Sequence, residues 1–227
     1  MPGCEISCKA SGLAGEGGSA HVLVYFVEPG DSPLARELVA LRAERLERNR
    51  LLAARLRELG FPVDYDAVVS RAGSEAGVGR PHFAQELVAA GHVEDVDDAF
   101  DRLLANDRPA YVPKARLTPA DVARIARSSG GVAVLAHPLS LGLAPAELER
   151  RVHELADAGL AGIEATYGRY TPRQRAGLRR MAGSAGLVAT GGSDYHGTFK
   201  PDLRVGRGQG DLEVDDSVLE QLADRRP

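Results

Sequence analysis

Tryptophan is absent from the 227-residue sequence, aromatic residues make up only 5% of it, and there are two cysteines. So few cysteines exclude a disulfide-rich secreted scaffold. Cys4 and Cys8 have the spacing of half a zinc site, but no second cysteine pair follows to complete it. We interpret both as small strand residues in a reducing cytoplasm.

The sequence also has little excess charge and no long apolar run. The net charge is −4, the pI is near 5.9, and basic residues are mixed with acidic ones. This balance argues against binding of duplex nucleic acid through a broad basic face, but it is compatible with a small nucleotide or short RNA. No apolar stretch approaches a membrane span, and Met1-Pro2-Gly3 does not resemble a secretory start, so we expect a cytoplasmic protein without a membrane partner.

Apolar runs and helical patterns divide the chain into two kinds of segment. We predict five strands, at residues 4–8, 21–27, 132–136, 161–166 and 187–190. Helical patterns alternate with the last three strands, which favours a parallel α/β sheet or barrel formed by 1–60 and 117–227. A long helix is predicted to begin at Pro33 and to end at Gly60. Residues 61–116 show short helices and turns, which predicts an all-helical insertion.

Two of the predicted strands lead directly into residues that commonly bind metals. The strand at 132–136 is followed by His137, and the strand at 187–190 is followed by a glycine-rich run that contains Asp194 and His196. The carboxyl ends of strands in such a barrel meet on one side, where active sites lie. We therefore expect these three side chains to converge.

Glu5 and His21, on the first two predicted strands, complete a set of candidate ligands with the three residues above. A buried glutamate needs a partner to stay charged, whereas His21 opens its strand and could also be structural. Imidazole and carboxylate groups suit zinc, manganese or iron, and one glutamate could bridge two ions. Such ions create a metal-bound hydroxide near neutral pH and screen an anionic substrate, which favours phosphate-ester hydrolysis with Glu5, His137, Asp194 and His196 as catalytic residues.

Four stretches together resemble the later motifs of the PHP (polymerase and histidinol phosphatase) family. They are Gly3-Cys4-Glu5-Ile6-Ser7, His21-Val22-Leu23, Leu135-Ala136-His137-Pro138 and Gly192-Ser193-Asp194-Tyr195-His196-Gly197. A further stretch, Gly79-Arg80-Pro81-His82, is similar to a signature in the helical insertion of one bacterial branch. Members of that branch act on nucleoside monophosphates such as AMP, on 3′,5′-bisphosphates and on the 5′ ends of short RNA, and the resemblance implies such an activity here.

The resemblance also implies a distorted (β/α)7-type barrel, similar to a TIM barrel, with about two to three divalent ions (manganese, zinc or iron). By that resemblance the metal ligands are Glu5, His21, His137, Asp194 and His196. Arg80 and His82 would touch the phosphate or its nucleoside, with bracing of the first helix of the insertion as the alternative. Tyr167, Arg169 and Lys114 are further candidates for the pocket.

The sequence departs from the family pattern at its beginning. The opening His-x-His strand, the acidic residue after it and the later Asp-His pair are missing, so an N-terminally incomplete barrel with five strands instead of seven is expected. Either Met1 is a misassigned start, or the protein is a catalytically impaired remnant that binds a metal, a nucleotide or a partner. A third interpretation is an amidohydrolase-like enzyme that cleaves carbon–nitrogen bonds.

Overall fold

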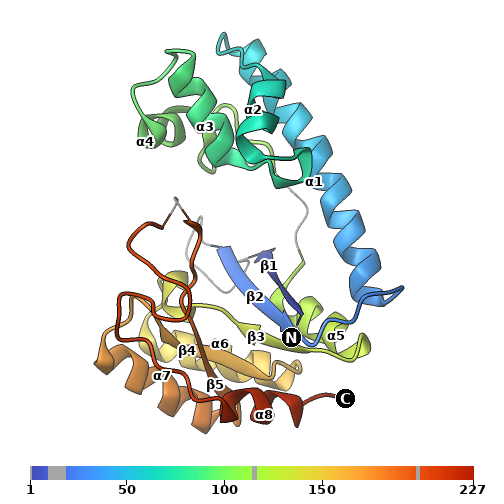
Figure 1. Cartoon of the computed structure of the whole chain (residues 1–227), viewed down its shortest axis with the longest axis vertical. Helices are drawn as coiled ribbons and strands as arrows, with labels where there is room; N and C mark the ends of the chain where they lie inside the picture. Colours follow the sequence, from blue (N-terminus) through green and yellow to red (C-terminus); the bar gives the residue numbers. More distant parts are fainter. Residues whose placement is uncertain (1, 10–18, 114–116, 198–199) are drawn as a thin grey trace. The chain divides into compact units, whose positions relative to one another are not determined.

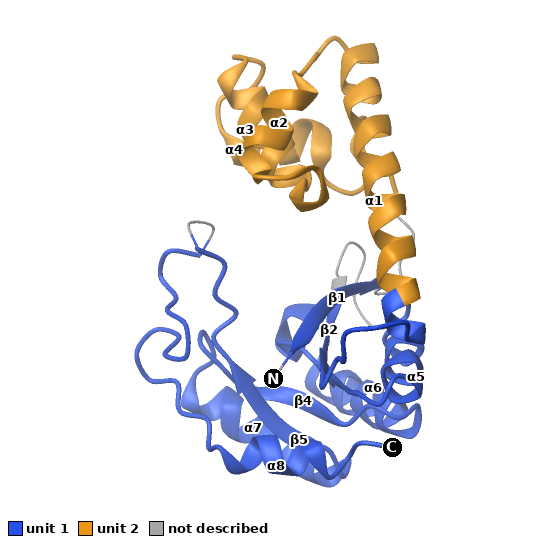
Figure 2. Cartoon of the chain, turned by 45° about the vertical axis from the view of Figure 1, so that its right-hand side comes forward, with its two compact units in different colours: residues 1–35, 116–227 blue, residues 36–115 orange. Residues whose placement is uncertain are grey.

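The computed structural model in Figure 1 describes residues 2–9, 19–113, 117–197 and 200–227. The glycine-rich connection 12–18 and Lys114 lie outside the described residues. The chain forms two compact units, shown in Figure 2. We call Met1–Ala35 with Arg116–Pro227 the sheet unit, and Arg36–Ala115 the helical unit.

The sheet unit contains one five-stranded sheet with the order β1-β2-β3-β4-β5. Its strands are β1 (Gly3–Lys9), β2 (Ser19–Tyr25), β3 (Val132–Leu135), β4 (Gly162–Tyr167) and β5 (Val188–Gly192). The predicted parallel arrangement is confirmed for β3, β4 and β5, but β2 pairs antiparallel with both of its neighbours. The link between β1 and β2 is too short for the crossover helix that parallel pairing requires. The α/β class and the five strands are confirmed, and closure into a barrel stays a prediction.

Helices pack around this sheet (Figure 1). They are α5 (Pro119–Ser128), α6 (Pro145–Asp157), α7 (Pro172–Ser184) and α8 (Ser217–Ala223), and the short 3-10 helix η3 (Pro138–Leu141) follows β3. The Thr118 hydroxyl accepts a hydrogen bond from the Asp121 amide at 3.1 Å, which satisfies a free N–H at the start of α5. Leu222 of α8 packs against Val132 and Val134 of β3. A well-packed core therefore supports the edge of the sheet at which the strands end.

The helical unit has a separate core. Helix α1 (Pro33–Glu58) begins at the predicted proline, and Gly60 after it has a φ of +84°. It is followed by α2 (Tyr65–Ala72), η1 (Glu75–Gly77), α3 (Arg80–Ala89), α4 (Val96–Ala99) and the π-helical turn η2 (Phe100–Leu104). Leu56 of α1 and Phe83 of α3 are fully buried in the same cluster. Most of α1 therefore belongs to this unit.

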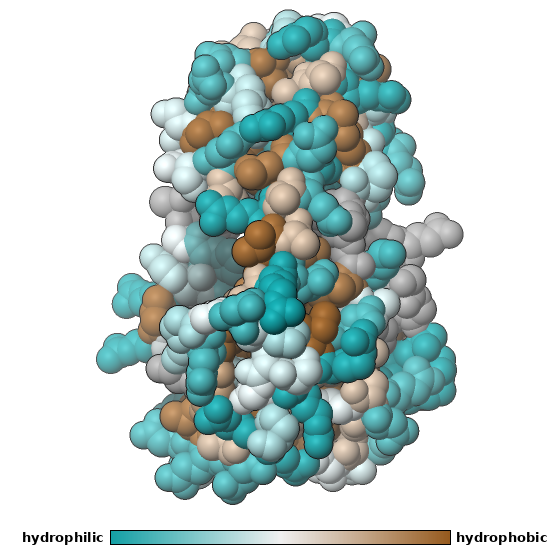
Figure 3. All heavy atoms as spheres, turned by 90° about the vertical axis from the view of Figure 1, so that its right-hand side faces the viewer, coloured by the Kyte–Doolittle hydropathy of each residue, from teal (hydrophilic) through white to brown (hydrophobic). Residues whose placement is uncertain are grey.

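Hydrophobic side chains on the surface are scattered. Figure 3 shows a face dominated by hydrophilic residues, with small hydrophobic patches between them. Within the described ranges, the exposed large hydrophobic residues are Val39, Leu51, Val96, Tyr195, Val205, Val214 and Leu219. None of the described helices combines the length and apolarity that crossing a bilayer requires.

Candidate active site

The candidate ligands come from four strands of the sheet unit. His137 lies two residues beyond the end of β3, while Asp194 and His196 follow β5. Because β2 runs opposite to β3, its first residues lie beside the end of β3, and the Ala136 amide donates to the His21 carbonyl at 2.9 Å. Glu5 lies on β1, the neighbour of β2. The reversed strand therefore delivers a histidine to the edge where β3 and β5 end.

Glu5, His21 and His137 form the first cluster, with one donor atom from each residue within 4.8 Å of the others. Glu5 Oε1 lies 2.8 Å from His21 Nδ1 and 3.8 Å from His137 Nε2. The two imidazole nitrogens are 3.1 Å apart. Two imidazoles and one carboxylate aimed at a common point are a donor set that suits zinc, manganese or iron.

Glu5, Asp194 and His196 form the second cluster, again within 4.8 Å. His196 Nδ1 lies 3.1 Å from Asp194 Oδ1. The Tyr167 hydroxyl donates to Asp194 Oδ2 at 2.9 Å, and the Lys200 ammonium contacts the same oxygen. Glu5 belongs to both clusters. The structure therefore brings the strand-end acids and imidazoles together in two groups that share Glu5, and their role as metal ligands stays a prediction.

The electrostatics of the first cluster favour a charged Glu5. Hydrogen bonds from His137 and then His21 hold the pKa of Glu5 far below its usual range, against the opposing effect of burial. For His137, burial acts to lower the pKa, but the hydrogen bond to Glu5 and the charges of Glu164 and Asp194 raise it overall. The charged form of Glu5 is the form of a carboxylate that can bind a cation.

His137 is held from two sides, and one of the groups that hold it is a glutamate that the sequence reasoning missed. Its Nδ1 lies 2.7 Å from Ser140 Oγ, which leaves Nε2 directed toward Glu5. The His137 backbone N–H donates to Glu164 Oε2 at 2.8 Å. The Ser140 contact at Nδ1 orients the ring of this candidate ligand, and the Glu164 carboxylate holds its backbone in place. The signal for Glu164 was available as a lone acid within an otherwise apolar strand.

Glu164 is 3% exposed, and burial raises its pKa to about 7. It faces Gly192, where a Cβ atom would lie 2.4 Å from Glu164 Oε1. A larger residue at position 192 would therefore displace this carboxyl group. His137 itself has a φ of +29°, a conformation that a histidine adopts only when its surroundings hold it there.

Replacing Glu164 by alanine is expected to weaken metal binding at the first cluster by about 10- to 100-fold, the usual effect of losing a group that orients a ligand. Glu164→Gln keeps an oxygen acceptor for the His137 N–H, so its affinity should stay close to that of the parent protein. Calorimetric titration with Mn²⁺ measures both variants. Equal affinities for the two variants would show that Glu164 does not position His137.

The residues predicted to bind substrate have partners inside their own units. In the helical unit, the Arg80 guanidinium donates to the Leu104 carbonyl at 2.9 Å and lies over the Phe100 and Tyr111 rings. His82 Nδ1 accepts from the Gly79 N–H at 3.0 Å. These contacts match the bracing role considered as the alternative for these two residues.

In the sheet unit, Tyr167 contacts Asp194 of the second cluster, as described above. The Arg169 guanidinium forms two hydrogen bonds to the Asp202 carboxylate, at 2.6 and 3.0 Å. Of these two predicted residues, Tyr167 is thus the one that contacts a candidate ligand directly.

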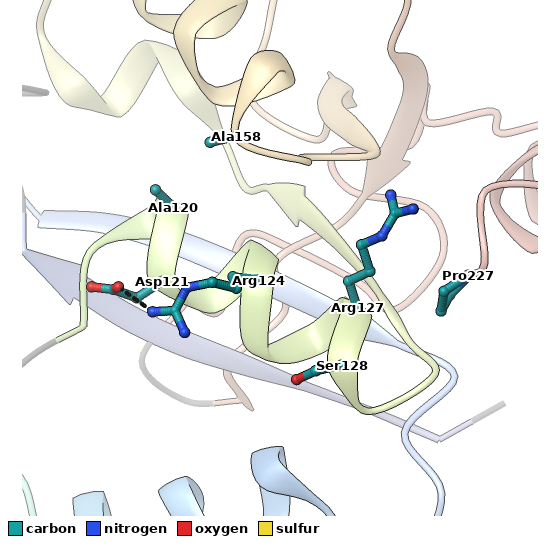
Figure 4. Close-up of a pocket in the computed structure, with 7 residues that line it drawn as sticks. All are labelled: Ala120, Asp121, Arg124, Arg127, Ser128, Ala158 and Pro227. Atoms are coloured by element: carbon teal, nitrogen blue, oxygen red, sulfur yellow. Dashed lines mark hydrogen bonds and ion pairs between the residues drawn. The ribbon is translucent and has the colours of Figure 1, made fainter.

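A pocket of about 600 Å³ lies elsewhere on the sheet unit (Figure 4). It is lined by Ala120, Asp121, Arg124, Arg127, Ser128, Ala158 and Pro227. Arg124 pairs with Asp121 at 2.7 Å within it. Because its lining includes no residue of either cluster, this pocket is separate from the candidate active site.

An α/β sheet whose edge gathers histidines and acids around a shared glutamate is the arrangement of a metal-dependent hydrolase. Comparisons of the sequence agree with this class, although no protein-family model matches the chain. The chain is 32% identical over 208 residues to the 5′-3′ exoribonuclease Rnm of Salmonella typhimurium, covering 91% of this chain and 68% of the relative. It is 30% identical over 188 residues to the 3′,5′-nucleoside bisphosphate phosphatase of Chromobacterium violaceum, covering 83% and 66%.

A phosphoribosyl 1,2-cyclic phosphate 1,2-diphosphodiesterase of Eggerthella lenta is 33% identical over 200 residues, covering 84% of this chain and 71% of that protein. The chain thus spans about two thirds of the length of these curated relatives. Their names describe hydrolases that cleave phosphate esters of nucleotides, RNA or sugar phosphates.

Two solved structures share the fold. A candidate metal-dependent phosphoesterase from Bifidobacterium adolescentis superimposes with a TM-score of 0.75 at 30% identity, covering 99% of this chain and 76% of that one. An amidohydrolase from Chromobacterium violaceum with bound sulfate superimposes with a TM-score of 0.76 at 27% identity, covering 98% and 76%. The chain therefore belongs to the family of nucleotide phosphoesterases that includes Rnm and the bisphosphate phosphatase, a hydrolase family consistent with the PHP-type resemblance of its motifs.

Proposed function

We propose that this protein is a metal-dependent phosphoesterase that hydrolyses phosphate monoesters of nucleotides. AMP, 3′,5′-nucleoside bisphosphates and the 5′ ends of short RNA are the substrates that the names of its relatives and its motifs favour. The single observation that carries the proposal is that Glu5 is common to two clusters of metal-binding groups at one sheet edge.

In this proposal His21, His137 and Glu5 hold one divalent ion, and Glu5, Asp194 and His196 hold a second. Manganese, zinc and iron all accept this mixture of imidazole and carboxylate ligands. When bound, such ions lower the pKa of a coordinated water and screen the charge of the phosphate group.

The remaining contacts orient the proposed ligands for metal binding. Ser140 and Glu164 orient His137, and the Tyr167 hydroxyl holds one oxygen of Asp194 so that the other faces His196. The phenol is suited to this role, because burial and the neighbouring carboxylate raise the pKa of Tyr167 and keep its proton in place. Arg169, Arg80 and His82 remain proposed contacts of the substrate. Replacing each arginine by lysine and the histidine by glutamine tests these contacts.

The test is a substrate panel with the purified protein, loaded in turn with Mn²⁺, Zn²⁺ and Fe²⁺. Release of phosphate from AMP, a 3′,5′-bisphosphate or a 5′-phosphorylated oligoribonucleotide is the expected result. A panel of amide substrates, assayed in parallel, tests whether the protein cleaves carbon–nitrogen bonds. The proposal fails if none of the three metals supports release of phosphate from any ester, and tight metal binding without turnover would indicate a binding protein instead.

A further inference from the structure

Lys200 places an ammonium group beside the second cluster. Its ammonium group contacts Asp194 Oδ2, the oxygen that also accepts the Tyr167 hydroxyl. The side chain of Asp194 is only 7% exposed, whereas that of Lys200 is 27% exposed. The lysine therefore reaches from the partly open surface to a nearly buried carboxylate.

The other ion-pair partners within the two clusters are histidines. In the described part of the chain, the ion-pair partners of Glu5 are His21 and His137, and those of Asp194 are His196 and Lys200. The histidines are themselves candidate metal ligands, whereas the Lys200 ammonium group has three N–H donors and no acceptor and so does not compete for this role.

Two arginines near the end of β4 form hydrogen bonds with groups outside the clusters. Arg169 is held by Asp202 through two hydrogen bonds. Arg175 is 7% exposed and donates to the carbonyl and the carboxylate of Asp211, both at 3.0 Å. Neither guanidinium contacts a cluster residue through these bonds, so of these three described cations Lys200 is the one in contact with a cluster residue.

We propose that Lys200 binds the phosphoryl group of the substrate. The inference rests on the proposed phosphoesterase function and adds a residue that the sequence motifs did not indicate. An ammonium group is a compact charge with three N–H donors on a flexible four-carbon stem, so it can move from the Asp194 carboxylate to a phosphoryl oxygen bound beside it. The phosphoryl group then receives a charged hydrogen bond.

Lys200→Met and Lys200→Arg test the proposal, with inorganic phosphate as the probe. Calorimetric titration of the metal-loaded protein should show phosphate binding weakened by about 10- to 100-fold in Lys200→Met, the factor expected from one charged hydrogen bond. Lys200→Arg should recover part of the affinity. Lys9→Met is the matched control, since Lys9 is the other lysine among the described residues and is exposed.

Kinetics add a second measurement. If Lys200 contacts the phosphoryl group, Lys200→Met should raise KM or lower kcat/KM while the metal content stays that of the parent protein. Unchanged phosphate affinity in Lys200→Met would overturn the proposal. Loss of metal together with phosphate affinity would also overturn it, because Lys200 would then act on Asp194 alone. Since phosphate binding needs no turnover, this result is distinguishable from a failure of the substrate panel.

Discussion

Replacing Glu5 by glutamine is expected to empty both metal clusters and to lower phosphoesterase turnover by on the order of 10³-fold, the factor that corresponds to about 4 kcal/mol of lost transition-state stabilisation. The reason is that Glu5 belongs to both groups of candidate ligands and carries the carboxylate beside two imidazoles. Glutamine has nearly the same shape but no negative charge, so the variant removes ligation with little change in packing. Metal content by elemental mass spectrometry and kcat on the best substrate measure the two effects.

Glu213→Gln provides the matched control, because Glu213 is an exposed glutamate of the same unit outside both clusters. It should keep the metal content and turnover of the parent protein. If Glu5→Gln retained a full complement of metal, the shared-carboxylate arrangement would be wrong. If it lost one ion and kept the other, Glu5 would serve a single site.

Adding Mn²⁺ to chelator-treated protein is expected to stabilise the sheet unit strongly. At a free concentration about a thousand times the Kd, binding to one site adds about 4 kcal/mol to the free energy of unfolding. For a unit of this size, that corresponds to a rise in Tm of roughly 8–16 °C. The physical reason is that the folded state alone brings Glu5, Asp194 and the histidines together. Thermal unfolding followed by calorimetry gives the shift.

Two variants make the thermal experiment specific. Glu5→Gln should lose most of the shift, whereas His153→Ala should keep it, because His153 is an exposed histidine of α6 outside the clusters. A Mn²⁺-dependent rise in Tm that is equal in the parent protein and in Glu5→Gln would place the binding site elsewhere in the molecule.

Local sequence patterns were sufficient to predict the elements that carry most of the candidate ligands. His137 and Asp194 were predictable because each follows a short apolar run, and buried strands of a parallel sheet end on one side. The long helix was predictable because Pro33 and Gly60 are residues whose backbone preferences mark a helix start and stop. These features depend on a few neighbouring residues, so no knowledge of distant contacts was needed.

Local sequence patterns did not indicate the direction of each strand or the contacts of its buried residues. A strand that runs parallel and one that runs antiparallel can have the same alternation of side chains, so the reversal of β2 emerged from its pairing with β1 and β3. That reversal is what brings His21 to the site. Glu164 could be noticed as a lone acid in its strand, but its contact with the His137 N–H emerged only from the pairing of β4 with β3.

By itself, then, the sequence determined the α/β class, the strand ends and the types of group that could bind metal, because periodicity and turn residues act over short distances. The tertiary structure alone decided that Glu5 is shared by two clusters, that Glu164 supports His137 and that Lys200 reaches Asp194. These contacts depend on how strands and loops far apart in the chain pack against one another, and packing is a property of the whole unit.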